Sequence, residues 1–169
     1  MRRFLLPIVL LTLLVTGCAA GASIDEPPEI LYGEDECERC RMIISDARYA
    51  AAYMTEDGQT RRFDDIGGML LHHLENEEDV HLFWVHDFES EVWVKADEAN
   101  YVVSEALETP MGFGIAAVNS REEAEEMAAE RDGEVFTFSQ LMDEAARGRL
   151  TPAHAHGQGH DGAGKDHDH

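Results

Sequence analysis

Sulfur-containing side chains gather in the stretch ECERCRM, in which two residues separate Cys37 from Cys40 and Met42 follows closely. Thiolate and thioether ligands together select Cu(I) over zinc, calcium or magnesium. Cys40 and Met42 are close enough in sequence to bind one ion from a single turn. This spacing predicts a soft-metal site at these two residues.

A second methionine, Met111, stands in the stretch ETPMGFG. Pro110 restricts the backbone there, and Gly112 and Gly114 allow another segment of the chain to approach closely. Methionine also fills irregular gaps in protein cores. Taken alone, the residues favour core packing for Met111 over a role as a metal ligand.

The cysteine pair has other interpretations. A structural zinc ion is not expected, because it takes four Cys and His ligands and only one C-x-x-C pair is present. His72 and His73 point about 100° apart on a predicted helix.

A redox couple would place the pair where a helix follows a strand. Arg39 and Arg41 would favour the thiolate form of such a couple. A disulfide suits an oxidising compartment, although so short a loop gains little stability. Both alternatives stay open.

The N-terminus predicts export. Met1–Arg3 is positively charged, Phe4–Val15 is apolar apart from Thr12, and the stretch LVTGC resembles a bacterial lipobox. Such a signal peptide, here residues 1–17, is removed from the mature chain, and it is too short for a comfortable membrane span. We expect Cys18 to carry a lipid, which makes the protein a membrane-anchored lipoprotein on the extracytoplasmic, periplasmic side.

The charge of the chain limits its partners. The 169 residues carry a formal net charge of −22, which becomes −24 once Arg2 and Arg3 leave with the signal peptide. Acidity of this size repels nucleic acid, anionic lipid surfaces and acidic substrates, and it favours cations and basic partners. We expect a monomer that binds no nucleic acid.

The predicted fold class is α+β, with two small ββαβ-type units and mainly antiparallel sheets. A lipidated flexible tether is expected over residues 18–36, where Gly, Pro and acidic residues dominate. The first unit, residues 37–88, carries the Cys/Met motif. Its predicted elements are an extended stretch Arg48–Thr55, a turn Glu56–Gly58, a strand Thr60–Phe63, a helix capped by Asp64 and Asp65, and a strand Val80–Asp87.

The second ββαβ-like unit is predicted over residues 89–150 and ends in a terminal helix. Its expected elements are strands at Glu91–Lys95, Tyr101–Ser104 and Phe113–Val118, a helix Ser120–Arg131 ended by Asp132 and Gly133, a strand in EVFTF and a helix in SQLMDEAARGR. The order of elements suggests a repeat of the first unit, although the two halves have no evident sequence identity.

The C-terminal tail, residues 151–169, is rich in histidine, glycine and aspartate and has nothing to bury, so disorder is predicted there. Its histidines are His154, His156, His160, His167 and His169. Neutral imidazole suits divalent copper and zinc. We expect weak, secondary metal binding by this tail, separable from the sulfur site.

Several stretches, taken together, carry a family resemblance. After the lipobox come CERCRM, DARYAAAYMTEDGQTRRFDDIGGML, WVHDFESEVWVKADEANYV and TPMGFGIAAVNS, in this order. They resemble the NosL family of copper-binding lipoproteins associated with nitrous-oxide reductase, over Cys37 to about Leu141. The resemblance implies an organomercurial-lyase-like architecture of two small ββαβ units, which agrees with the predicted element order.

The resemblance also implies a function. It points to a periplasmic Cu(I) chaperone, not an enzyme, that delivers copper for maturation of the copper–sulfide cluster of nitrous-oxide reductase in denitrification. The implied partners are the reductase and its ABC-type maturation complex. Family copper binding maps onto Cys40 and Met42, and also onto Cys37 and Met111, with Met54 or a histidine completing the ligand set.

One position departs from the family pattern. The family usually reads C-x-x-C-G-M, and this chain has Arg41 at the glycine position while it keeps both sulfur ligands. A turn that needs a positive φ would be strained there.

Three other functions remain as alternatives. The first is a periplasmic thiol–disulfide oxidoreductase that uses Cys37 and Cys40. The second is a carbon–mercury lyase, for which Asp64 or Asp65 would be the acid. The third is a lipid-anchored scaffold that only docks partners.

Overall fold

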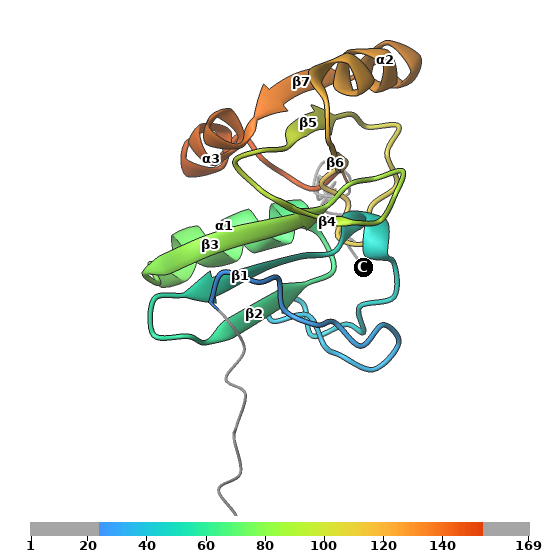
Figure 1. Ribbon diagram of the computed structural model, residues 1–169. Helices are drawn as coiled ribbons and strands as arrows, with labels where there is room; N and C mark the ends of the chain where they lie inside the picture. Colours follow the sequence, from blue (N-terminus) through green and yellow to red (C-terminus); the bar gives the residue numbers. More distant parts are fainter. Residues whose placement is uncertain (1–23, 154–169) are drawn as a thin grey trace, which may run out of the picture.

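The computed structural model describes residues 24–153, and over these residues it contains two antiparallel sheets and three α-helices (Figure 1). The signal peptide, Cys18 and the five tail histidines lie outside the described residues. Within the described range, no helix has the length and apolar character needed to span a membrane.

The first sheet has the strand order β2-β1-β3-β4. Its strands are β1 (Ala51–Thr55), β2 (Thr60–Phe63), β3 (Val80–His86) and β4 (Trp93–Lys95). Helix α1 (Ile66–Asn76) connects β2 to β3. The predicted hairpin between β1 and β2 is confirmed, with the β2 bounds as expected.

The second sheet has the order β6-β5-β7. Its strands are β5 (Asn100–Val103), β6 (Ile115–Val118) and β7 (Glu134–Thr137). Helix α2 (Arg121–Arg131) lies between β6 and β7 in the chain, and α3 (Phe138–Ala146) follows β7. Each unit therefore runs β-β-α-β and pairs its first strand with the other two, so the predicted repeat of element order extends to the strand pairing.

The boundary predicted between residues 88 and 89 does not separate the two sheets. Strand β4 comes after it in the sequence, yet β4 pairs with β3, with His86 opposite Trp93. Asp87 makes this close return possible, because its Oδ2 accepts hydrogen bonds from the backbone and the hydroxyl of Ser90. The second sheet begins only at β5.

The predicted tether is wrong in its last part. Ile30 is buried in the core, and the backbone of Gly33 donates to the carbonyl of Ile44. The side chain of Arg62 donates to the carbonyl of Glu29 at 2.8 Å. These contacts attach the residues before Cys37 to the domain.

The extended stretch predicted from Arg48 begins instead with a short 3₁₀ helix, η1 (Ala47–Tyr49). Asp46 caps this turn by accepting from the backbone of Arg48. The strand β1 starts two residues after η1 ends.

One hydrophobic core joins the two units. It contains Tyr53, Phe63 and Ile66 from the first unit together with Tyr101, Ile115 and Leu141 from the second. Helix α1 packs against the first sheet and also contacts α3 (Figure 1). Because the core is shared, loops of the second unit can reach the start of α1.

Candidate metal centre

The cysteines lie at the tip of a closed loop, residues 37–42. The backbone N–H of Cys37 donates to the carbonyl of Met42 at 2.8 Å, and that of Arg41 donates to the carbonyl of Cys37 at 3.0 Å. A β-bridge between Glu36 and Ile43 closes the base of the loop. Arg41 has a φ of 63°, so this chain makes a turn with positive φ at a residue other than glycine.

Two contacts fix this loop against the first unit. The backbone of Glu38 donates to the carbonyl of Arg62 on β2 at 2.9 Å. The guanidinium of Arg39 makes a bidentate ion pair with the carboxylate of Glu75 on α1. The loop is therefore attached both to a strand and to a helix.

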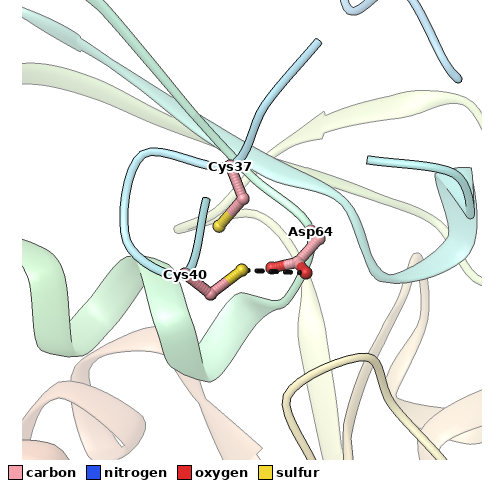
Figure 2. A group of neighbouring side chains, drawn as sticks. All are labelled: Cys37, Cys40 and Asp64. Carbon is pink, nitrogen blue, oxygen red and sulfur yellow. Dashed lines mark hydrogen bonds between the residues drawn. The ribbon is translucent and has the colours of Figure 1, made fainter. Parts of the chain in front are cut away.

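The loop brings both cysteines to Asp64, the residue before the cap of α1 (Figure 2). One ligand atom from each of Cys37, Cys40 and Asp64 can be chosen so that all three lie within 4.8 Å of one another. The thiol of Cys40 donates to Oδ2 of Asp64 at 3.2 Å. Both cysteines are free thiols in this structure.

Asp64 has an oxygen without a protein partner. The residue is only 2% exposed, and its Oδ1 is buried with no hydrogen bond. A buried polar atom without a partner is costly. An ion held between the cysteines and Asp64 would satisfy this oxygen, so the donor set fits a bound metal.

The structure corrects the predicted effect of the arginines on the thiols. The pKa of Cys40 is raised to about 12, first by burial and then by the neighbouring Cys37 and Asp64, while the Met42 backbone acts in the opposite direction. Arg39 is paired with Glu75, and Arg41 is exposed beside Glu38. A metal that binds Cys40 near neutral pH must therefore displace a proton.

The second carboxylate, Asp65, has different hydrogen-bond partners from Asp64. It is the N-cap of α1 and accepts from the backbone of Gly67 at 2.8 Å. Its Oδ2 accepts from the hydroxyl of Thr109 at 2.6 Å and from the backbone of Met111 at 3.0 Å. Burial raises its pKa, and these three hydrogen bonds oppose that rise. Asp65 thus attaches the β5–β6 loop to the start of α1.

Two glycines of α1 make room for this loop. A Cβ on Gly68 would lie 2.6 Å from the sulfur of Met111 and 3.8 Å from Cδ of Arg39. A Cβ on Gly67 would lie 2.3 Å from the ring of Phe113. The sulfur of Met111 therefore sits over the first turn of α1, beside the arginine that adjoins Cys40.

The structure thus sorts the sulfur residues proposed from the sequence. Cys37 and Cys40 lie beside Asp64, the sulfur of Met111 lies over the first turn of α1, and Met42 lies two residues beyond Cys40 and is 47% exposed. Met54 is buried toward the hairpin end of β1, where it accepts from the hydroxyl of Thr60. Met54 is therefore a core residue and not part of this centre.

Asp64 was not predicted as a metal ligand; the sequence suggested it only as a helix cap or as the acid of the lyase alternative. The prediction did not distinguish Asp64 from Asp65 in either role, and the structure gives the helix cap to Asp65 alone. A signal was present, because one N-cap position takes one side chain and the sequence FDDI offers two adjacent acids. The aspartate that does not cap the helix is available to bind a metal.

Comparisons with known proteins bear on the family and the fold of this chain. A family model described as NosL matches residues 28–146. The chain is 30% identical to the copper-binding lipoprotein NosL of Stutzerimonas stutzeri over 165 residues, which covers 88% of this chain and 86% of that protein. The crystal structure of the copper chaperone NosL from Shewanella denitrificans matches with a TM-score of 0.59 at 19% identity, over 67% of this chain and 93% of the other. This last match bears on the fold.

Proposed function

The chain belongs to the NosL family, and we propose that it is a lipid-anchored chaperone that binds one Cu(I) ion and delivers it for assembly of the copper–sulfide cluster of nitrous-oxide reductase. Cys40 and Met111 are the central ligands in this proposal. Cys37 and Met42 are further sulfur donors, and Asp64 is an oxygen neighbour.

The observation that supports the proposal is the group formed by Cys37, Cys40 and Asp64 before the start of α1, with the sulfur of Met111 over the first turn of that helix. Cys37 and Cys40 come from the first unit, and Met111 comes from a loop of the second unit that Asp65 holds in place. Sulfur donors of these two kinds favour Cu(I). A thioether is neutral, so it adds a soft donor without adding charge to the site.

The protonated state of Cys40 supports a protein that carries and releases copper rather than one that stores it. Because the pKa of this thiol is raised to about 12, protons compete with the metal at neutral pH. The competition lowers the net affinity and eases transfer to an acceptor with more thiolate or sulfide ligands.

The same features argue against a thiol oxidoreductase, and we propose that the protein is not an enzyme. Catalytic C-x-x-C cysteines have lowered pKa values, commonly at a helix N-terminus. Here the pair lies in a loop closed by backbone hydrogen bonds, and the pKa of Cys40 moves upward.

The proposed location is the periplasmic face of a membrane, with the anchor on Cys18. Replacing Cys18 with serine should release the folded protein into the soluble fraction. The acidic chain, with a net charge of −22, favours basic surfaces on the proposed partners, the reductase and its ABC-type maturation complex.

The test of the function is a titration of the reduced protein with Cu(I) in competition with a Cu(I)-selective chromogenic chelator. We expect one tightly bound Cu(I) per chain and no comparable binding of zinc. Equal affinity for zinc would contradict the proposal. So would a protein that takes no Cu(I) from the chelator.

A second candidate function is cleavage of carbon–mercury bonds. It is favoured by the group of two thiols and a carboxylate that Cys37, Cys40 and Asp64 form. In such a step the carbon would take a proton from the site, and Hg(II) would remain on the two sulfurs. Incubation of the copper-free protein with an alkylmercury salt tests it, since this function requires release of the alkane. We rank it second because it gives Met111 no role.

A further inference from the structure

Exposed apolar side chains are concentrated in one region of the described chain. Within residues 24–153 the exposed large hydrophobic residues are Ile24, Leu31, Tyr32, Met42, Ile43 and Val92. Four of these six fall within residues 31–43. Single exposed apolar residues are common on protein surfaces, whereas a group of them marks a surface that another molecule covers.

Backbone contacts bring the two ends of this region together. The N–H of Gly33 donates to the carbonyl of Ile44, and the N–H of Ile44 donates to the carbonyl of Asp35, both at 2.9 Å. A β-bridge joins Glu36 to Ile43. The stretches 31–36 and 42–44 are therefore paired. We call the four exposed apolar residues on them the exposed cluster: Leu31, Tyr32, Met42 and Ile43.

Tyr32 connects the exposed cluster to an open cavity. Asp46, Arg48 and Glu91 also line this cavity. Asp46 is paired with Arg48 at 2.6 Å. Glu91 is exposed, precedes the exposed Val92, and forms no ion pair among residues 24–153. The cavity therefore presents an unpaired carboxylate that can receive a lysine or arginine side chain from another protein.

The charges within residues 31–43 are mostly negative. Glu34 and Glu36 are exposed, and in the described part of the chain neither forms an ion pair. The exposed Arg41 lies 3.8 Å from Glu38. An apolar centre with an acidic rim complements a protein surface whose apolar centre is bordered by lysine or arginine. The net charge of −22 opposes association with a second copy of this chain or with an anionic membrane.

The exposed cluster adjoins the cysteine loop. Met42 belongs to both, and the β-bridge at Ile43 closes the base of that loop. Transfer of a metal ion between proteins requires a ligand of the acceptor to reach the ion before the donor protein releases it. A protein seated on the exposed cluster contacts the loop that carries Cys37 and Cys40, which is the position that such a transfer needs.

We propose that the exposed cluster docks the copper acceptor, whose surface has an apolar centre bordered by basic side chains, one of which enters the cavity beside Glu91. The inference rests on the proposed function and adds a docking surface to it. Substitutions of exposed residues have small effects on the fold. Changes at Leu31, Ile43 and Glu91 therefore separate docking from folding and from Cu(I) binding.

The test measures binding of the copper-free chain to the purified ABC-type maturation complex in detergent, by biolayer interferometry. Every sample carries Cys18→Ser, so that a lipid anchor does not contribute. We expect L31S/I43S to bind about tenfold more weakly than this parent chain, because two apolar contacts are lost. The control I24S removes an exposed isoleucine outside the exposed cluster. It should bind within about twofold of the parent chain.

A second variant tests the charge beside the cavity. Glu91→Gln keeps the shape of the side chain and removes its charge, and we expect binding about threefold weaker at low ionic strength. The difference should disappear at about 0.5 M salt, where the charges are screened. Circular dichroism spectra and Cu(I) affinities should match those of the parent chain in all variants.

Binding of L31S/I43S equal to that of the parent chain would overturn the inference. So would a parent chain that binds Cu(I) but not the maturation complex. Two further measurements exclude other occupants. If L31S/I43S abolished binding to vesicles of phosphatidylethanolamine and phosphatidylglycerol, the exposed cluster would be a lipid contact and the inference would fail. It would fail equally if the parent chain were a dimer in sedimentation and L31S/I43S a monomer.

The proposed function is tested separately in the same samples. A parent chain that takes no Cu(I) from the chelator contradicts the proposed function, whereas docking is measured without copper.

Discussion

The two units of this protein share one pattern of strand pairing but differ in the connection between their first two strands and in the start of their helix. In the first unit, β1 and β2 are joined by a tight turn over residues 56–59, while in the second the connection from β5 to β6 spans residues 104–114 and carries Met111. The start of α1 is buried and has two glycines, whereas α2 starts with an exposed capping box at Ser120. The two units share their strand pairing, and the candidate metal centre is formed by the features in which they differ.

The largest expected effect compares the N-caps of the two helices. Asp65→Ala leaves three donors without an acceptor, from Gly67, Thr109 and Met111, and should lower the free energy of unfolding by about 4 kcal/mol. Ser120→Ala removes an exposed cap and should cost about 1 kcal/mol. Urea denaturation of both variants measures the difference. Equal losses would mean that Asp65 does no more than an ordinary cap.

The next effect concerns pH. The pKa of Cys40 is raised to about 12, so the thiol stays protonated from pH 6 to 8 and Cu(I) must displace the proton. Raising the pH weakens that competition, and the apparent Cu(I) affinity should rise roughly tenfold per pH unit for each thiol displaced. Competition titrations at several pH values, corrected for the chelator, check this. A flat profile would mean that the thiol is already ionised.

A third comparison concerns the Cu(I) affinity of two methionine variants, one at Met111 between the units and one at Met54 in the core. Met111→Leu should weaken Cu(I) binding about tenfold, because a thioether donor is lost while the volume is nearly kept. Met54→Leu, in the core of the first unit, should leave Cu(I) binding unchanged. Parallel competition titrations with circular dichroism test the pair. Equal affinities in the two variants would remove the second unit from the centre.

The smallest effect lies in the cysteine loop itself. Arg41 has a φ of 63°, and Glu77, the C-cap of α1, has a φ of 50°. Glycine adopts this region without the penalty that a Cβ brings, so Arg41→Gly and Glu77→Gly should each raise the unfolding free energy by about 1 kcal/mol. Thermal or urea unfolding measures both. A loss of stability in Arg41→Gly alone would show that the arginine has a contact worth more than the strain.

Local signals explain which parts of this arrangement could be predicted from the sequence. The hairpin to Phe63, the cap at Asp65 and the end of α2 at Asp132 depend on residues close together in the chain, and the structure has all three. Period and capping rules act over the same short range.

The failures have long-range causes. Burial of Ile30 and pairing of β4 with β3 depend on surfaces that form only when the sheets assemble. The different roles of Asp64 and Asp65 likewise depend on the cysteine loop, from which Cys40 donates to Asp64, and on the Met111 loop, whose backbone donates to Asp65. No spacing in the sequence brings those two loops together at the start of α1.

The central claim is that Cys40 holds the metal at the meeting point of the two units. The most direct test is the Cu(I) affinity of the reduced Cys40→Ser variant, measured by competition with a Cu(I)-selective chelator, with circular dichroism as the control for folding. We predict a folded variant that has lost high-affinity binding altogether. Cu(I) affinity equal to that of the wild type would contradict the account and favour a docking scaffold in its place.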